Sequence, residues 1–362
     1  MLGAAHEVGA VNELHFAVCI GIDRYPGFPG LDLGSARVDA QSFRDWLIAD
    51  EGGRLPPGNV ALVTAPADEV WPSFLDARPH VREINRILHG FNVRIRERLA
   101  ERPGDWERTR VYLYAAGHGV GPPRGECGVL MADSDPDLLG NYVDVSKYRD
   151  WYVSCGLVHE VAIFADCCRE IVRGVPPANE VPFSTCSLDG PSGTSAFTAY
   201  ATRLGERAWE PAAATERDRA RGYFTRALIT GLLGGAADAS GAVTSPALGE
   251  FIGMALGEMT RDAPFAQEAE PHHRPGSALV FGGRRDRVLQ RVTISFPPGF
   301  ESPVVVRSGQ RNLHGPWQPA NGDWSLDLPN GFYEVVPADP PAAGDQGGWL
   351  FKIVGANVEV RL

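Results

Sequence analysis

The sequence lacks a long hydrophobic run, which argues against a helix that crosses a membrane. Such a helix needs about 18 or more consecutive apolar residues, and no segment of the 362-residue chain approaches that length. Residues 1–10 also lack the basic start and apolar core that mark a secretory signal. We therefore expect a cytoplasmic protein with no membrane partner.

Positive charge is scarce as well. The chain has 34 Lys and Arg residues against 45 Asp and Glu residues, which gives a formal net charge of -11. This balance argues against nucleic acid or an anionic membrane as the main partner. The hydrophobic fraction of 44% and the charged fraction of 22% are typical of a globular protein with a sizeable core.

The cysteines show no paired spacing of the kind that binds zinc. A chain of this length also needs no disulfide bonds to complete its core. We therefore expect reduced thiols and no metal site. The six cysteines are Cys19, Cys127, Cys155, Cys167, Cys168 and Cys186.

Up to about residue 283, short apolar runs alternate with helical patterns. This order predicts an α/β fold, with a largely parallel sheet flanked by helices on both faces. In such sheets the reactive residues gather beyond the carboxyl ends of the strands. Strands are expected at 15–22, 59–63, 111–116, 127–131 (a neighbour of 111–116), 158–165, 197–202 and 277–281, and helices at 38–48, 79–102, 145–155, 223–233 and 246–259.

Beyond about residue 287 the helical pattern disappears, and short alternating segments are separated by Pro, Gly and Asn. This pattern predicts a small all-β sandwich domain over 288–362, separate from a first domain over 12–283. No catalytic cluster is visible in the β domain, and we expect it to dock a partner, a substrate or the first domain. The strands are expected at 292–296, 304–306, 324–328, 333–336, 349–354 and 358–360.

Two polar segments follow predicted buried strands, Ala-Gly-His-Gly at 116–119 and Asp-Cys-Cys-Arg at 166–169. A histidine in a loop usually lies at the surface, and a cysteine usually lies in the core. Together, each beyond the end of a buried strand, they favour a thiolate paired with an imidazole, as in cysteine proteases. Gly119 would leave its N–H accessible to a developing oxyanion.

These segments resemble the His-Gly and Asp-x-Cys motifs of caspases, metacaspases and their prokaryotic relatives. The matching residues are LYAAGHGV at 113–120 and IFADCCRE at 163–170. FAVCIGIDRY at 16–25, GSARVDA at 34–40 and residues 223–247 resemble further parts of that family, so that the resemblance covers about 12–283. It implies a caspase-like fold.

The resemblance also implies a mechanism. The Asp-x-Cys frame selects Cys168, not Cys167, as the nucleophile, and His118 would protonate the leaving amine. The N–H groups of Gly119 and Cys168 would hold the oxyanion, without a metal or other cofactor. Calcium activation, which occurs in the family, is not supported by the sequence, because the acidic residues at 133, 135 and 137 have no other oxygen ligands in view.

Three positions decide the specificity that the resemblance implies. Caspases, which cut after Asp, carry Gln where this chain has Asp166, whereas metacaspases, which cut after Arg or Lys, carry Asp. Asp39 matches a metacaspase pocket residue, and Glu210 replaces the arginine of a caspase Trp-Arg pair. Carboxylates would pair with a guanidinium, so we expect a protein substrate cut after basic residues, Arg in preference to Lys. The segment from Ala208 would bind the substrate backbone as an added strand, with Trp209 beside the neighbouring subsite.

Each of these residues also has a simpler interpretation. Asp39 could be a helix N-terminal acid, Asp166 could bond only to a loop, and Glu210 could be exposed. The chain also departs from the metacaspase pattern, with Ala116 where many members carry Ser and Ala36 where many carry Cys.

We therefore expect a caspase- or metacaspase-like cysteine endopeptidase, controlled by self-processing or by a regulatory protein. The loops at 173–193 and 211–221 are candidate processing sites, the second because it contains Arg217, Arg219 and Arg221. By resemblance the pathway would be a prokaryotic stress, cell-death or antiviral defence response. The alternatives are a catalytically silent scaffold with the same fold and a different thiol enzyme, such as an acyltransferase.

Overall fold

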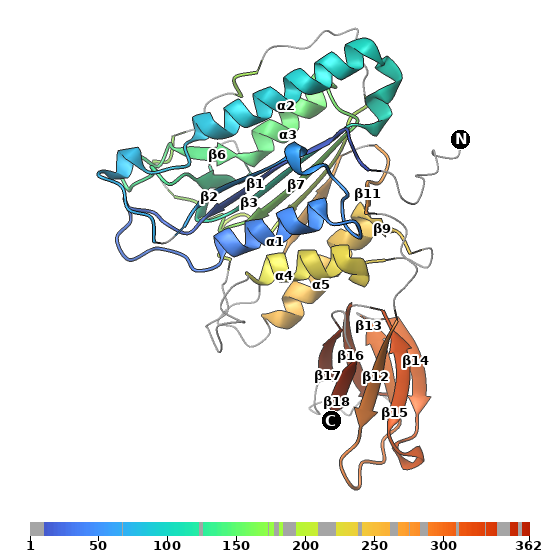
Figure 1. Cartoon of the computed structure of the whole chain (residues 1–362). Coiled ribbons are helices and arrows are strands. Elements are labelled where there is room, and N and C mark those ends of the chain that lie inside the picture. The colour runs from blue at the N-terminus through green and yellow to red at the C-terminus, as the bar shows by residue number, and fades with distance from the viewer. Residues whose placement is uncertain are drawn as a thin grey trace. The chain divides into compact units, whose positions relative to one another are not determined.

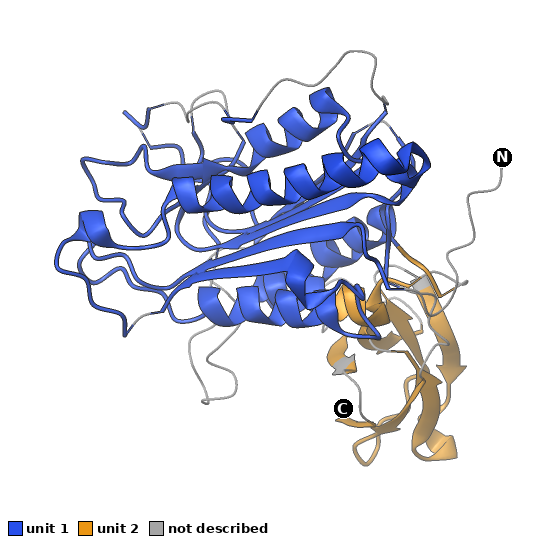
Figure 2. Ribbon diagram, turned by 45° about the horizontal axis from the view of Figure 1, so that its top comes forward, with its two compact units in different colours: residues 1–229, 244–283 blue, residues 230–243, 284–362 orange. Residues whose placement is uncertain are grey.

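The computed structural model divides into two compact units, residues 1–229 with 244–283 and residues 230–243 with 284–362 (Figure 2). Residues 230–243, which the sequence analysis assigned to the first domain, group with the second unit. The structure describes residues 11–66, 68–122, 126–172, 174–176, 181–183, 193–208, 222–237, 241–260, 267–274, 276–282, 289–308, 311–329, 331–338, 348–353 and 357–362.

The first unit is built on a six-stranded sheet with the order β10-β8-β7-β3-β1-β2. Five strands are parallel, and β10 joins the edge antiparallel to β8. Strands β1, β3 and β8 are buried along their whole length, as expected for a sheet covered on both faces. The strands are β1 (His15–Ile22), β2 (Val60–Ala65), β3 (Arg110–Ala116), β7 (Glu160–Asp166), β8 (Ser195–Tyr200) and β10 (Glu270–His273).

Helices cover both faces of this sheet. Figure 1 shows α2 and α3 on one face, and α1, α4 and α5 on the other. The prediction of a largely parallel sheet flanked by helices is therefore confirmed. The helices are α1 (Ala36–Ile48), α2 (Val81–Glu101), α3 (Val145–Cys155), α4 (Tyr223–Thr230) and α5 (Ser245–Met259), with short helical turns at Pro57–Asn59, Phe74–Asp76, Pro103–Arg108, Gly231–Gly235 and Pro319–Asn321.

The segment predicted at 127–131 forms a strand, but its predicted place beside 111–116 is wrong. β5 (Gly128–Leu130) pairs antiparallel with β4 (Gly119–Val120) and β6 (Tyr142–Asp144) in a separate small sheet. The reason is that both edges of β3 are already occupied, by β1 and β7. Two further short strands precede residue 283, β9 (Val243–Thr244) and β11 (Val280–Phe281).

The second unit consists of two sheets around one apolar core, which confirms the predicted sandwich. One sheet has the order β15-β12-β18 and the other β14-β13-β16-β17, and buried side chains from both sheets meet in the core. The strands are β12 (Gln290–Ser295), β13 (Val304–Ser308), β14 (Arg311–Trp317), β15 (Trp324–Leu328), β16 (Gly331–Pro337), β17 (Trp349–Ile353) and β18 (Val358–Arg361). The edge strand β14 was not predicted, because residues 312–316 are exposed and carry no alternating apolar pattern.

None of the described helices is both long and apolar enough to cross a bilayer. The expectation of reduced thiols throughout is wrong, because a disulfide bond is present. Cys155, at the end of α3, is disulfide-bonded. Cys19, Cys127, Cys167 and Cys168 are free thiols.

Candidate active site

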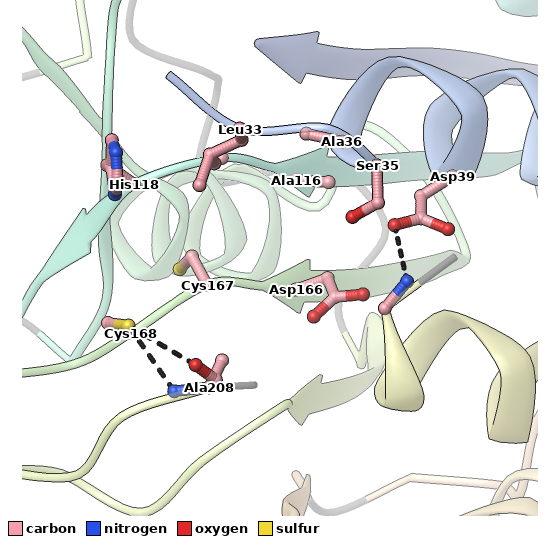
Figure 3. A pocket seen from close by; sticks show the side chains of 12 residues that line it. Leu33, Ser35, Ala36, Asp39, Ala116, His118, Asp166, Cys167, Cys168 and Ala208 are labelled. Atoms are coloured by element: carbon pink, nitrogen blue, oxygen red, sulfur yellow. Dashed lines mark hydrogen bonds between the residues drawn. The ribbon is translucent and has the colours of Figure 1, made fainter. Parts of the chain in front are cut away.

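The carboxyl ends of β3 and β7 lie side by side, with Ala116 opposite Asp166 in the parallel register. His118 and Cys168 each follow two residues later, so they come from neighbouring strand ends. A pocket of about 140 Å³ opens at this edge (Figure 3). It is lined by Leu33, Ser35, Ala36, Asp39, Ala116, Gly117, His118, Asp166, Cys167, Cys168, Ala208 and Gly222.

The half-buried His118 is held by two residues of the loop after β1. Its backbone N–H donates to the Tyr25 hydroxyl over 2.9 Å, and the two rings lie 4.7 Å apart. Its Nε2 lies 2.5 Å from the carbonyl oxygen of Leu31. A carbonyl can only accept, so Nε2 must carry the proton and Nδ1 is left as the basic nitrogen of the neutral ring.

Gly117 makes the turn before His118 possible. Its φ is 156°, and a Cβ there would lie 2.4 Å from the Tyr25 hydroxyl oxygen. The backbone N–H of Gly117 donates to the carbonyl of Asp166 over 3.3 Å, which ties the histidine turn to the cysteine-bearing strand. Gly117 belongs to the Ala-Gly-His-Gly segment found in the sequence, whereas the roles of Tyr25 and Leu31 were missed. A carbonyl leaves no sequence signal, because any residue can supply one.

Cys168 is half-buried, and its thiol contacts the backbone of Ala208. The Ala208 N–H donates to Sγ over 3.3 Å, and the Ala208 carbonyl oxygen lies 3.9 Å from the same atom. Burial raises the pKa of the Cys168 thiol above its usual value, and the Ala208 N–H opposes that shift only in part. Among the described residues, Sγ is hydrogen-bonded to Ala208 and not to the His118 ring.

Cys167 has a different environment from its neighbour. It is buried, and its Sγ lies 3.3 Å from the Sγ of Cys127, which is also buried. The hydrogen bond with Cys127, together with burial, raises the pKa of Cys167 well above its usual value. A thiol that remains protonated inside the core is unsuited to act as a nucleophile.

The backbone at Gly119 passes close to the cysteine segment. A Cβ at Gly119 would lie 2.3 Å from the Cys168 carbonyl oxygen and 2.6 Å from the Cys167 Sγ. Only glycine fits without displacing these atoms. This close approach is what a paired oxyanion site from Gly119 and Cys168 would need, and that role stays a prediction.

Two carboxylates line the other end of the pocket. Asp39 lies in the first turn of α1 and is 1% exposed, and Asp166 ends β7 and is 9% exposed. A Cβ at Gly222 would lie 2.7 Å from Asp166 Oδ2 and 3.3 Å from Asp39 Oδ2, so both carboxylates converge there. The Gly222 N–H donates to Asp39 Oδ2 over 2.9 Å (Figure 3). Two buried carboxylates that face one space favour a cation in it.

Asp166 is bonded to helix α4. The N–H and the hydroxyl of Thr225, in the first turn of α4, bond to Asp166 Oδ2 over 3.2 Å and 2.6 Å. The Tyr114 hydroxyl lies 2.5 Å from the Thr225 hydroxyl. Burial raises the pKa of Tyr114 well above its usual value, and the negative charges of Asp39 and Asp166 act in the same direction. Sequence reasoning missed Thr225 and Gly222, because only the packing of α4 brings them to Asp166 and Asp39.

The remaining candidate residues are only partly described. Ala208 lines the pocket, whereas Trp209, Glu210 and the arginines at 217, 219 and 221 lie outside the described residues. In the acidic loop, Asp135 Oδ1 accepts from the N–H groups of Asp137 and Leu138. Across the described part of the chain, no three His, Cys, Asp or Glu residues are grouped so that they could hold a metal.

No family model matches the chain. It is 27% identical over 229 residues to a probable protease from a Desulfuromonadales bacterium, which covers 61% of this chain. The chain spans about a quarter of that relative's length, since the match covers 26% of it. The chain is also similar to the crystal structure of caspase-1 from Spodoptera frugiperda, with a TM-score of 0.46 and 12% identity over 77% of this chain and 93% of that one. A structure of pro-sf-caspase-1 gives a TM-score of 0.44 and 13% identity over 76% and 93% of the two chains.

Proposed function

We propose that the protein is a cysteine endopeptidase that cleaves after basic residues, with Arg preferred to Lys. The observation that carries this proposal is the composition of the pocket. It holds a thiol and an imidazole, from Cys168 and His118, together with two buried carboxylates, from Asp39 and Asp166. The similarity to a probable protease supports the same class of activity.

In the proposed reaction, the Cys168 thiol gives its proton to Nδ1 of His118, because the Leu31 carbonyl keeps the proton on Nε2. The sulfur forms a bond to the peptide carbonyl carbon, and the displaced electron pair resides on the oxygen. The N–H groups of Gly119 and Cys168 stabilise that oxyanion. When the C–N bond breaks, His118 returns its proton to the leaving amine. Water, activated by the same imidazole, then cleaves the thioester and releases Cys168.

The carboxylates provide the specificity. A P1 guanidinium can form paired hydrogen bonds with carboxylates, whereas an ammonium acts as a compact point charge. A P1 aspartate would meet like charge from Asp39 and Asp166. Ala208, Trp209 and Glu210 complete the proposed binding surface for an extended substrate.

The contact between Cys168 and Ala208 provides a way to control the proposed protease activity. In this state the thiol is bonded to Ala208, and its pKa is raised, so it must be released before it can pair with His118. Self-cleavage after Arg217, Arg219 or Arg221, or the binding of a regulatory protein, would supply that release. By resemblance we place this activity in a cytoplasmic stress, cell-death or antiviral defence pathway, without calcium or another cofactor and with neither nucleic acid nor membrane as partner.

The same contact favours the second candidate, a catalytically silent scaffold. A thiol bonded to Ala208 and not to His118 is what a non-catalytic relative would contain. The scaffold proposal predicts that substitution of Cys168 leaves every function of the protein unchanged.

Cleavage of fluorogenic peptides that differ only at P1 (Arg, Lys, Asp or Ala) tests the proposal. We expect Arg peptides to be cleaved fastest, Lys peptides more slowly and Asp peptides not at all. Cys168→Ala should abolish cleavage, whereas the matched Cys167→Ala should retain it, because that thiol is buried against Cys127. Equal activity of wild type and Cys168→Ala would refute the proposed nucleophile, and cleavage after Asp would refute the acidic pocket.

A further inference from the structure

Asp166 is held by a chain of hydroxyl groups whose direction can be worked out. The Thr225 hydroxyl lies 2.6 Å from Asp166 Oδ2, and a carboxylate can only accept, so the hydroxyl donates. The Thr225 hydroxyl has only one proton, so it cannot also donate to Tyr114. The Tyr114 hydroxyl, 2.5 Å from Thr225 Oγ1, must therefore donate to Thr225. The order of donation is Tyr114 to Thr225 to Asp166.

Both hydroxyl groups of this hydrogen-bond chain lie in the interior. Tyr114 and Thr225 are both 0% exposed, so water cannot replace either hydroxyl. The N–H of Thr225 donates to the same Oδ2 over 3.2 Å. One oxygen of the carboxylate thus receives two donors from α4, which fixes its orientation.

The three residues of this hydrogen-bond chain come from three different elements. Tyr114 lies on β3 and Thr225 in the first turn of α4, whereas Asp166 ends β7. Neither hydroxyl residue lines the pocket. Any effect on a ligand must therefore act through Asp166.

We propose that Thr225, supported by Tyr114, is a positioning residue that sets the affinity of the pocket for a guanidinium group. This inference rests on the proposed preference for basic P1 residues. A carboxylate held in one orientation can meet the planar fork of a guanidinium, whereas a carboxylate free to rotate loses part of that paired geometry.

Calorimetric binding of agmatine, a small guanidinium compound, to the full-length Cys168→Ala protein separates affinity from catalysis. Thr225→Val removes the hydroxyl at nearly constant volume, and we expect about tenfold weaker binding from the loss of a hydrogen bond to a charged group. Thr225→Ser keeps the hydroxyl and should bind within about twofold of the parent.

Thr198→Val is the matched control. Thr198 is 1% exposed on β8 of the same sheet, and its hydroxyl makes no hydrogen bond within the described part of the chain. It does not line the pocket. The same change of a buried hydroxyl to a methyl group should leave agmatine binding unchanged here.

Kinetics of the active enzyme give a second measure. Thr225→Val should raise KM for Arg peptides about tenfold and leave kcat largely unchanged, because the hydroxyl acts on substrate affinity. Alkylation of Cys168 by iodoacetamide, a neutral reagent, should proceed at the wild-type rate. A merely structural defect would instead slow alkylation and lower kcat together.

The outcomes are distinguishable. If the Cys168→Ala parent binds no agmatine, the proposed basic specificity fails, and this inference fails with it. If the parent binds but Thr225→Val binds equally well, only the positioning role is overturned. If Thr225→Val does not fold, Tyr114→Phe takes its place; it removes the second donor and should weaken binding about threefold, and no change would overturn the inference.

Discussion

Cys168 and Cys167 are adjacent in sequence, but their surroundings give them different chemistry. The Cys167 side chain is enclosed with Cys127, whereas Cys168 is half-buried at the pocket, where its thiol is hydrogen-bonded to the backbone of Ala208. The state in the structure also keeps Cys168 protonated, because burial raises its pKa. A resting enzyme with this thiol should react slowly at neutral pH.

The pH dependence of alkylation tests that statement. A thiol with a raised pKa becomes thiolate only as pH rises through the raised value. We therefore expect the rate of Cys168 alkylation by iodoacetamide to increase steadily above neutral pH, with an inflection above that of an ordinary cysteine. Peptide mass analysis would separate Cys168 from the other thiols. An inflection below neutral pH would instead indicate a thiolate already paired with His118, contrary to the structure.

Among the elements, the segment that follows β7 is fixed by the buried Arg169. Its guanidinium donates to the carbonyls of Glu126 and Thr202 over 2.6 Å and 2.9 Å and pairs with the carboxylate of Glu270. It also lies 4.2 Å from the centre of the Tyr200 ring. These contacts join the residue after Cys168 to the segment before β5, the segment after β8 and the start of β10.

Removal of the Arg169 guanidinium should lower the free energy of unfolding. Arg169→Leu leaves Glu270 and two carbonyls without their donor, and we expect a loss of about 3 kcal/mol in the free energy of unfolding. Arg203→Leu is the control, because Arg203 pairs with Glu268 at the surface and should cost less than about 1 kcal/mol. Urea titration measures both. Equal losses would mean that the buried network does not hold the segment.

At the scale of the whole molecule, the layers of the fold could be predicted, because buried parallel strands are continuous apolar runs and α2 carries an apolar stripe. His118 and Cys168 followed from their motifs and strand ends. What could not be predicted depends on contacts distant in sequence, such as Thr225 against Asp166 and the Leu31 carbonyl against His118. β14 was missed because an exposed edge strand needs no apolar alternation.

The whole chain should also process itself if its pocket accepts arginine. We expect prolonged incubation of the wild type to produce fragments that begin at residue 218, 220 or 222, after Arg217, Arg219 or Arg221. Cys168→Ala should remain intact alone and be cut when wild-type enzyme is added. Gel electrophoresis with N-terminal mass analysis identifies the bonds. A wild type that cleaves Arg peptides but remains a single intact band would exclude self-processing.

The central claim is a protease with one thiol nucleophile and an acidic pocket, and its most direct test is the position of the bonds that it cuts. Mass spectrometry of a defined peptide mixture, incubated with wild type or with Cys168→Ala, gives every cleaved bond at once. We expect cleavage after Arg, less often after Lys, and none with Cys168→Ala. Cleavage after Asp, or the same products from both proteins, would contradict it.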